Sequence, residues 1–557
     1  MKLRHPALVE IESSLLAKGA PFELEDGEVR GERLQLFKNR PSSLRALLDR
    51  ARLHAEAPFI TAETDTGEIA LTHAEFFGRV AAIAHLLRNE YGIQKGDAIA
   101  ILGANSAEWA IAFMAIQALG GVAQAWNGWW AGEEIRWAAD FCAPRLLLAD
   151  GPRLARLQSE PSVPVLRLES LLHLSDVQAA ELPEADIDED DDALVLFTSG
   201  TSGRPKGVIH SHLNVTSALM LGFFHGARVA ALHPPGDEAP PNTVLITSPF
   251  FHVSGLHAGI LTVLAGGAHA VLPRGRFESA KIARLIEKHR ITSWGYTPTL
   301  LRRLVEAPEI HAHDLSSLRV IGGGGAPVPP DLQEKVREVF PSLRETFSIG
   351  YGLTEGTAFG TLNPAEEWLV DPESVGRPLP TIEVSIRDEH GNELPEGELG
   401  EVHLRSPLVM SGYLNDEEAT RQMIRPGLLL RTGDLGLLKD GRLYLASRRS
   451  DLILRGGENV YPAEIEARLD AHRSVAESAV IGVPDRDLGQ IVKAIVVPRD
   501  PERFDLQALI EWVREGLAYY KIPERWEIRT APLPRNATGK IIRPALLESK
   551  ENPFIQE

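Results

Sequence analysis

The sequence predicts an α/β protein with a large N-terminal domain and a small α+β C-terminal domain. Its 557 residues are too many for a single hydrophobic core. From Phe59 onward, short strand-like runs alternate with helical segments, which is typical of α/β architecture. The character of the sequence changes near Arg448, and the roughly one hundred residues that follow suffice for a small domain. We therefore place the domains at residues 1–449 and 450–557.

Apolar runs predict three buried strands of the large domain, at residues 98–102, 145–149 and 243–247. Between the first two lies an apolar stretch from Trp109 to Trp126, which approaches the length of a membrane span. Glutamines and paired glycines interrupt it, so we expect a buried helix instead. This helix is predicted over residues 106–119, ended by glycine, and followed by a strand over residues 122–126.

Composition restricts the function. The net charge of −19 disfavours nonspecific binding to nucleic acid and to anionic membranes, so anionic ligands need local basic groups. The single cysteine, Cys142, rules out an intrachain disulfide and fits a reducing compartment. It lies in an apolar stretch, which favours a core position over a nucleophile. No signal-peptide apolar region follows the first six residues, and we expect a cytoplasmic protein.

The stretch from Thr198 to Gly207 predicts a polyphosphate-binding loop. It follows an apolar run at residues 193–197 that is short enough to be a buried strand. Its glycines allow close approach of a ligand, its amides and hydroxyls can donate to anionic oxygens, and Lys206 adds a positive charge. It lacks the Gly-Lys-Ser/Thr spacing of the Walker loop, and a flexible connector is the alternative interpretation when the loop is taken alone.

Four further motifs follow in a fixed order: Tyr351–Glu355, Arg431–Asp434, Arg455–Glu466 and Leu533–Ile541. Together with the glycine-rich loop they resemble the adenylate-forming (AMP-binding) superfamily, in its acyl-CoA synthetase or fatty-acid–CoA ligase branch. The resemblance implies a large domain of stacked sheets with helices and a small β-barrel. It also implies a small mobile C-terminal domain that carries the catalytic lysine and rotates over the large one.

The resemblance implies a two-step reaction. A carboxylate attacks the α-phosphate of ATP, which gives acyl-AMP and pyrophosphate, and CoA thiolate then displaces AMP. Both steps need alignment and charge neutralisation more than a protein nucleophile. The substrates and cofactor implied are a carboxylic acid, ATP, CoA and Mg²⁺. A homodimer is a further possibility that the resemblance raises.

The resemblance assigns the nucleotide site residue by residue. Tyr351 stacks on adenine, Thr354 contacts the α-phosphate region, and Asp434 with Arg448 reaches the ribose. A carboxylate can accept two hydrogen bonds from ribose hydroxyls, which suits Asp434. The full implied set of ATP- and AMP-binding residues is Thr198, Ser199, Gly200, Ser202, Gly203, Lys206, Gly323, Gly324, Ala326, Pro327, Tyr351, Gly352, Thr354, Asp434 and Arg448.

The catalytic residues are assigned in the same way. Lys540 bridges carboxylate and phosphate oxygens, a role that suits a compact ammonium. Glu355 and Thr201 hold Mg²⁺, and His252 lies beside the acyl-AMP. The remaining assignments are Phe251, His252, Gly322, Gly323 and Ala358 for the acyl pocket, Gly456, Gly457 and Glu458 for the CoA step, and Ser450 for the hinge. At the hinge, Ser450 stands where the family usually has lysine or aspartate.

These residues predict an acyl-CoA synthetase for a hydrophobic monocarboxylic acid: a fatty, aryl or steroid side-chain acid. The alternative is an adenylating enzyme that passes the acyl group to a carrier protein or another acceptor. No carrier domain fits in the seventeen residues after Lys540. A non-catalytic protein of the same fold is a third interpretation, which the intact Lys540, Glu355, Thr201 and Asp434 disfavour.

Overall fold

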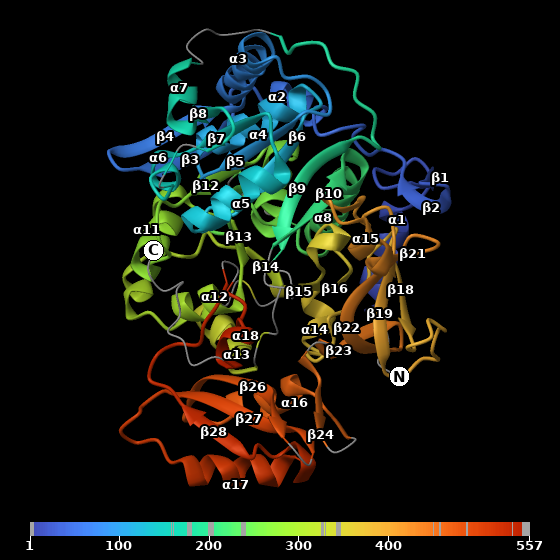
Figure 1. Cartoon of the computed structure of the whole chain (residues 1–557), viewed down its shortest axis with the longest axis vertical. Coiled ribbons are helices and arrows are strands. Elements are labelled where there is room, and N and C mark those ends of the chain that lie inside the picture. The colour runs from blue at the N-terminus through green and yellow to red at the C-terminus, as the bar shows by residue number, and fades with distance from the viewer. Residues whose placement is uncertain are drawn as a thin grey trace.

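Two large sheets covered by helices form the N-terminal part of the computed structural model, and a smaller sheet domain lies below them in Figure 1. The structure describes residues 5–157, 159, 161–174, 181–198, 205–234, 241–324, 328, 330–340, 343, 347–448, 451–455, 458–485, 488–517, 519–536 and 539–547. The mixed α/β class and the division into a large N-terminal and a small C-terminal domain confirm the sequence prediction.

The first sheet has the strand order β20-β10-β9-β6-β5-β7-β8. Strands β5 to β9 pair in parallel, whereas β10 pairs antiparallel with β9 and with β20. The strands are β5 (Ala98–Leu102), β6 (Val122–Trp126), β7 (Leu146–Ala149), β8 (Val165–Arg167), β9 (Asp192–Thr198), β10 (Lys206–Ser211) and β20 (Gly412–Tyr413). Three of the predicted strands, at residues 98–102, 122–126 and 193–197, therefore lie side by side in this sheet.

Helix α4 (Ala107–Ala118) confirms the prediction that the apolar stretch is a core helix. The Ser106 side chain caps it by accepting a hydrogen bond from the Trp109 amide, and every side chain of the helix except Glu108 is buried. Gly120 follows two residues after the end of the helix, with a φ of +69° that glycine adopts without strain. The helix has no polar face because the protein interior surrounds it on all sides, and no membrane is needed to explain its composition.

The second sheet has the order β17-β16-β15-β14-β13-β11-β12-β3-β4. Its strands are β3 (Pro58–Thr64), β4 (Gly67–Thr72), β11 (Thr243–Leu245), β12 (His269–Leu272), β13 (Ser293–Tyr296), β14 (Val320–Gly324), β15 (Phe347–Tyr351), β16 (Thr361–Asn363) and β17 (Arg377–Pro378). Strands β13, β14 and β15 are parallel, so their carboxyl ends meet at one edge of the sheet. The last residue of β14, Gly324, lies opposite Gly350 near the end of β15, and this edge of the sheet is where ligand sites of α/β sheets lie.

A third sheet joins β18 (Glu383–Arg387), β19 (Gly400–Arg405), β21 (Ile424–Arg425), β22 (Leu429–Lys439) and β23 (Arg442–Arg448) in antiparallel pairs. Among the described residues these pairings form an open path and not the closed ring of the expected β-barrel. A separate hairpin, β1 (Leu24–Val29) with β2 (Glu32–Phe37), lies at the edge of the large domain near β21 (Figure 1).

The C-terminal domain is an α+β unit with its own apolar core. Its sheet contains β24 (Ile453–Arg455), β25 (Glu458–Val460), β26 (Val475–Asp485), β27 (Gly489–Pro498) and β28 (Arg525–Ile528). Its helices are α16 (Pro462–Asp470), α17 (Leu506–Gly516) and α18 (Pro544–Leu547). The expected boundary at 449/450 falls on residues outside the described set and stays a prediction.

The remaining helices cover the sheets of the large domain. They are α1 (Pro6–Leu15), α2 (Leu47–Leu53), α3 (His73–Tyr91), α5 (Gly132–Cys142), α6 (Gly151–Leu154), α7 (Leu171–Leu174), α8 (His212–Leu232), α9 (Val253–Gly255), α10 (Thr262–Ala265), α11 (Ser279–His289), α12 (Pro298–Val305), α13 (Pro330–Val339), α14 (Ala365–Trp368) and α15 (Glu417–Met423). The short helical turns are η1 (Leu168–Ser170), η2 (Leu256–Leu261), η3 (Pro308–Ala312), η5 (Thr354–Gly356) and η7 (Tyr519–Lys521). Helix α8 is long and apolar enough to cross a membrane by length and composition alone, and half of its apolar window is buried inside the fold.

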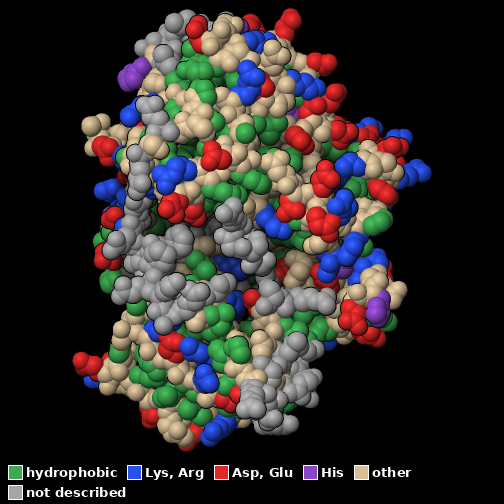
Figure 2. Space-filling model, in the orientation of Figure 1, with side chains coloured by type: hydrophobic (Ala, Val, Ile, Leu, Met, Phe, Trp, Pro, Cys, Tyr) green, Lys and Arg blue, Asp and Glu red, His purple; other side chains and the backbone are tan. Residues whose placement is uncertain are grey.

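The surface carries charges of both signs. Figure 2 shows acidic and basic side chains interspersed over one face, without a continuous basic track among the described residues of that face. Cys142 lies in the core as expected, 9% exposed, and burial raises the pKa of its thiol to about 12. A thiol held in the protonated form is a poor nucleophile, so Cys142 is a packing residue.

A buried ion-pair network fastens the β22–β23 hairpin to helix α14. Arg442, 1% exposed, contacts Glu367 at 3.1 Å and Asp371 at 3.4 Å. The Tyr444 hydroxyl donates to Asp371 at 2.6 Å. Burial, as the larger cause, and this hydrogen bond raise the pKa of Tyr444 to about 12. Charges this deeply buried are tolerated only when each has its partner.

We predict that Arg442→Ala lowers the free energy of unfolding of the large domain by about 3–5 kcal/mol, because two buried carboxylates lose their main cationic partner. Urea denaturation followed by intrinsic tryptophan fluorescence measures this effect. Arg421→Ala, which removes an exposed arginine from helix α15, is the control and is expected to leave the midpoint nearly unchanged. Similar midpoints for the two variants would contradict the prediction.

Candidate active site

The predicted phosphate loop joins two antiparallel strands at the edge of the first sheet. Thr198 ends β9 and Lys206 begins β10, and the two residues face each other in register. The Lys206 Nζ lies 4.8 Å from the centre of the Tyr413 ring and 3.9 Å from the Asp416 carboxylate. The chain therefore leaves the sheet at Thr198 and re-enters it at the paired position, Lys206, which is compatible with a ligand-binding loop between them. The loop residues Ser199, Gly200, Thr201, Ser202 and Gly203 lie outside the described residues.

Tyr351 and Asp434, predicted for adenine and ribose, lie in direct contact. The Tyr351 hydroxyl donates a hydrogen bond to Asp434 Oδ2 at 2.7 Å, and both residues are buried. The Asp434 amide donates to the Thr432 hydroxyl at 3.1 Å, which fixes the backbone beneath the carboxylate. Arg448 stands opposite Asp434 in the β22–β23 register. The fold thus brings Tyr351 to the β22–β23 hairpin that carries Asp434 and Arg448, and the prediction placed these three residues in one nucleotide site.

Glu355, predicted to hold Mg²⁺, lies in the turn η5 directly after β15. Its Oε1 accepts a hydrogen bond from the Tyr413 hydroxyl at 2.8 Å, and its carbonyl accepts one from the Met410 amide at 2.9 Å. Tyr413 therefore lies between Lys206 on one side and Glu355 on the other. Sequence reasoning missed Tyr413 and Met410, because both belong to a short segment, β20 and the residues before it, that carries no recognisable motif.

The backbone after Glu355 is strained. Thr357 and Ala358 have φ values of +49° and +80°, in a region that residues other than glycine rarely adopt. This turn brings the Ala358 carbonyl so close to Gly352 that a Cβ on Gly352 would lie 1.8 Å from its oxygen. Only glycine fits at position 352, and Ala358, predicted for the acyl pocket, is held against the nucleotide motif.

Two of the three glycines of β14 allow neighbouring chain to pack closely against the strand, and do not leave open space for a ligand. A Cβ on Gly323 would meet the Tyr296 carbonyl oxygen at 2.5 Å and its ring at 2.7 Å, so that side of Gly323 is filled. A Cβ on Gly324 would meet a carbonyl oxygen of the neighbouring strand at 2.4 Å. At Gly322 it would make only an ordinary contact of 3.4 Å with Ser348. Gly322 can therefore border a pocket. At Gly323, which was also predicted for the acyl pocket, Tyr296 fills the side where a side chain would lie. The predicted residues Ala326 and Pro327 lie outside the described residues.

The predicted acyl-pocket histidine is neutral. Burial lowers the pKa of His252 to about 4, and its Nδ1 accepts the Ser254 amide at 3.3 Å. The ring can therefore donate from Nε2 but carries no charge near pH 7. Phe251, its neighbour, packs edge-on against Trp129 with ring centres 5.9 Å apart, so this wall of the predicted pocket is aromatic.

Two further buried histidines, which were not predicted, lie near the turn η5 that carries Glu355. His210 donates from Nε2 to the Thr354 carbonyl at 2.7 Å, and burial lowers its pKa to about 4. The His257 ring stands edge-on to it with centres 5.5 Å apart, and burial lowers the pKa of His257 well below its usual value. Within the described residues, no cluster of three histidine, cysteine or acidic side chains could hold a metal ion.

Lys540, the predicted catalytic lysine, lies in a tight turn of the C-terminal domain. The Lys540 amide donates to Asn536 Oδ1 at 2.9 Å, and Gly539 adopts a φ of +81° within the turn. Arg535 fixes the turn by donating to the Gly539 carbonyl at 2.8 Å and by pairing with Glu477 at 2.8 Å. The lysine is thus presented on a braced turn rather than on a helix.

The hinge and the CoA-step loop lie mostly outside the described residues. Ser450, Gly456 and Gly457 are not among the described residues. Glu458 is described and begins β25 opposite Arg455. Asp451, one residue after Ser450, pairs with Arg543 at 3.3 Å, and Arg543 also pairs with Glu466 at 2.6 Å. An acidic group therefore lies next to the predicted hinge residue, and Arg543 engages it.

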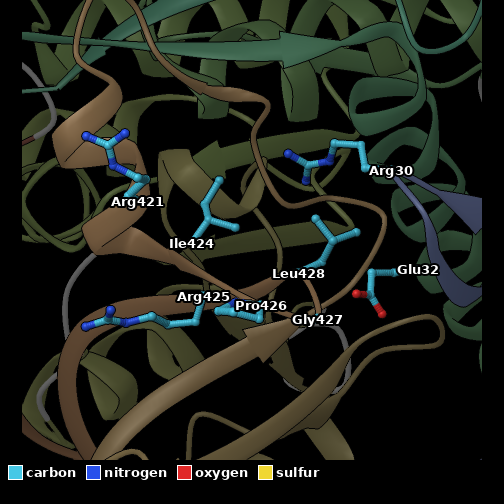
Figure 3. Close-up of a pocket in the computed structure, with 8 residues that line it drawn as sticks. All are labelled: Arg30, Glu32, Arg421, Ile424, Arg425, Pro426, Gly427 and Leu428. Carbon is cyan, nitrogen blue, oxygen red and sulfur yellow. The ribbon is translucent and has the colours of Figure 1, made fainter.

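The open cavity in Figure 3 is a separate feature. It measures about 500 Å³ and none of the predicted site residues lines it. Its walls come from the β1–β2 hairpin and from the segment around β21: Arg30, Glu32, Arg421, Ile424, Arg425, Pro426, Gly427 and Leu428.

Comparisons with known proteins identify the family of this chain. A family model described as AMP-binding enzyme matches residues 47–414, and one for the AMP-binding enzyme C-terminal domain matches residues 464–540. The chain is 33% identical over 490 residues to a long-chain-fatty-acid–CoA ligase, FadD13, of Mycobacterium tuberculosis. This match covers 86% of this chain and 93% of that protein. It is 33% identical over 481 residues to a feruloyl-CoA synthase of an Amycolatopsis species, again covering 86% and 93%. The structure of o-succinylbenzoate CoA synthetase (MenE) of Bacillus subtilis with its acyl-adenylate intermediate matches with a TM-score of 0.76, 31% identity, and coverage of 92% and 99%.

The buried neutral histidines make stability depend on pH. An unfolded histidine titrates near pH 6.5, whereas folded His210 titrates near pH 4, so the unfolded chain binds more protons between these values. Stability is therefore full above about pH 6.5 and is lost as the pH falls through about 4, by up to roughly 3 kcal/mol for His210.

We predict that His210→Gln makes this acid loss shallower, because glutamine keeps a donor for the Thr354 carbonyl and does not titrate. Unfolding midpoints measured from pH 7 to pH 4 test this, with His390→Gln at an exposed position as the control. A pH profile of His210→Gln as steep as that of the wild type would show that His210 is not the titrating group.

Proposed function

Because this chain belongs to the AMP-binding enzyme family, we propose that it is an acyl-CoA synthetase that activates a hydrophobic monocarboxylic acid. In the first step a carboxylate oxygen attacks the α-phosphorus of ATP and pyrophosphate leaves. In the second step the CoA thiolate attacks the acyl carbonyl, AMP leaves, and acyl-CoA forms. The relatives named above are CoA ligases for a fatty acid, ferulate and succinylbenzoate, which supports this class of reaction.

The observation that carries the proposal is the position of Tyr413 between Lys206 and Glu355. One side chain thus contacts both Lys206 of the phosphate loop, through its ring, and the proposed metal carboxylate, through its hydroxyl. A phosphate held by the loop would then lie within reach of a cation held by Glu355. Neutralising the phosphates in this way is what adenylation requires, because the carboxylate nucleophile and the triphosphate repel each other.

The residues present fit Mg²⁺ bound together with ATP. Glu355 offers a carboxylate, half-buried, with one oxygen engaged by Tyr413. Mg²⁺ is usually held by one or two carboxylates plus substrate phosphates rather than by a cage of protein ligands. We assign Glu355 and Thr201 to this ion, which polarises the phosphates when it is bound.

Asp434 and His252 fit binding roles within the same reaction. The Asp434 carboxylate keeps one oxygen on the Tyr351 hydroxyl, and a carboxylate has further acceptor sites for ribose hydroxyls. Neutral His252 can donate a hydrogen bond to an acyl or phosphate oxygen without bringing a charge. Lys540 would then supply the positive charge from the C-terminal domain.

An acid without a second charged group fits the pocket best. Its described wall carries Phe251 packed on Trp129, together with uncharged His252 and the Ala358 turn. Neither a lysine nor an arginine is among these residues to pair with a second carboxylate. We therefore propose a fatty, aryl or steroid side-chain acid, acting in the cytoplasm, where a lone buried cysteine is compatible with reducing conditions.

We predict acid-dependent release of pyrophosphate from ATP and Mg²⁺, with turnover that continues only when CoA is present. A panel of fatty, aryl and steroid side-chain acids, assayed with and without CoA, measures this. A dicarboxylate panel is the matched control, and we expect it to be inactive. Adenylation that does not respond to CoA would favour transfer to a carrier protein or another acceptor.

We predict that Lys540→Ala nearly abolishes adenylate formation and leaves thioester formation from supplied acyl-AMP largely intact. The lysine acts on the combined charge of the carboxylate and the triphosphate in the first step, whereas acyl-AMP brings only a single phosphate into the second. Pyrophosphate exchange and CoA-dependent consumption of acyl-AMP separate the two steps. Lys439→Ala, on an exposed end of β22, is the control, and equal slowing of both steps by Lys540→Ala would exclude this role.

A further inference from the structure

Arg30, at the tip of the N-terminal hairpin, reaches into the large domain. Its Nη1 donates to the Met410 carbonyl at 2.9 Å and more weakly to the Ser411 carbonyl at 3.4 Å, and its Nη2 donates to the Val409 carbonyl at 2.9 Å. Figure 3 shows the guanidinium pointing away from its own hairpin. The hairpin precedes the region matched by the family model, which begins at residue 47.

The segment that Arg30 holds is the one that holds Glu355. The Met410 amide donates to the Glu355 carbonyl at 2.9 Å, and the Tyr413 hydroxyl donates to the Glu355 carboxylate at 2.8 Å. Met410 is fully buried, so its backbone cannot shift without repacking its side chain. One short stretch of chain therefore fixes both the backbone and the carboxylate of Glu355.

The same stretch also contacts the phosphate-loop strand. The Ser411 amide donates to the Ile209 carbonyl at 2.8 Å, and the Leu414 amide donates to the Gly207 carbonyl at 2.7 Å, next to Lys206. Residues 409–414 thus link β10 to the turn η5. A shift of this stretch would move Glu355 relative to the phosphate loop.

Arginine suits this task better than lysine. Its planar fork reaches two carbonyls 2.9 Å away at once, whereas an ammonium is a point charge without that geometry. Burial lowers the pKa of Arg30, and the nearby carboxylates of Asp190 and Asp192 oppose that shift, so the fork remains charged. Asn214 also donates to this stretch, to the Pro407 carbonyl at 2.7 Å and to the Val409 carbonyl at 3.2 Å. The Val409 carbonyl therefore accepts hydrogen bonds from both Arg30 and Asn214.

We propose that Arg30 is a positioning residue for Glu355, so that the N-terminal hairpin sets the affinity for Mg²⁺ together with ATP. The inference rests on the proposed function, because it takes Glu355 as the metal carboxylate. Arg30 touches neither metal nor nucleotide in this scheme. It acts through the carbonyls of residues 409–411 and the hydrogen bonds that Met410 and Tyr413 give to Glu355.

The test is calorimetric binding of ATP to the full-length protein at increasing Mg²⁺ concentration, without any acid substrate. We expect Arg30→Ala to raise the Mg²⁺ concentration for half-maximal ATP binding by about tenfold, as loss of a group that orients a metal ligand does. Arg30→Lys, which keeps the charge but not the fork, should show a smaller rise in the same direction. Arg33→Ala, on the same hairpin with a side chain 80% exposed, is the matched control and should bind as the wild type does.

Two results separate this inference from the proposed function. If Arg30→Ala and Arg30→Lys keep the wild-type Mg²⁺ dependence and only unfold at lower temperature, Arg30 merely fastens the hairpin and the inference is wrong. If wild-type protein binds ATP with Mg²⁺ but turns over no acid, the proposed function is wrong while the role of Arg30 is still decided by its variants. Should Arg30→Ala fail to fold, Arg30→Lys alone decides the question.

Discussion

The hydrogen bond from Tyr413 to Glu355 joins the two large sheets where the candidate site lies. Tyr413 belongs to the first sheet through β20, and Glu355 follows β15 of the second. A second bond of the same kind, from Tyr351 to Asp434, joins the second sheet to the third. Two tyrosine hydroxyls that donate to carboxylates therefore link three sheets next to the candidate site. A hydrogen bond to a charged group is stronger than a neutral one, which suits contacts that must fix a site at sheet junctions.

Close backbone approach is the second constraint on this region. At Gly352 and Gly324 a Cβ would lie 1.8 Å and 2.4 Å from a carbonyl oxygen, so the local geometry accepts glycine alone. Thr357 and Ala358 hold positive φ values in the same turn. Strain of this kind persists only where the surroundings over-determine the backbone, and here Met410 and Tyr413 supply that restraint. The rigidity serves Glu355, whose carboxylate must be presented in one direction.

Local patterns predicted the elements but not the contacts between them. The helix over residues 106–119 and its flanking strands were predictable because apolar runs and glycine punctuation act over a few residues. The neighbourhood of Tyr351 and Asp434 came from the resemblance alone, because 83 residues separate them. Tyr413, Arg30 and Arg442 were not predicted, since each acts through partners in other sheets and none belongs to a motif. Gly323 was expected to leave pocket space, and only the structure shows Tyr296 filling that side.

The charges of the two domains suggest why the lysine comes from the smaller one. The large domain keeps its site histidines neutral by burial, so His252 and His210 add no positive charge to a protein with a net charge of −19. A cation delivered by the C-terminal domain can neutralise the phosphates during adenylation and be withdrawn afterwards. That domain has its own core, and Arg499 pairs with Glu306 of the large domain at 3.6 Å, with both side chains more than 30% exposed. An exposed pair of this kind contributes little to stability. Under the proposed function, Lys540 would therefore supply the positive charge that burial denies to the histidines of the site.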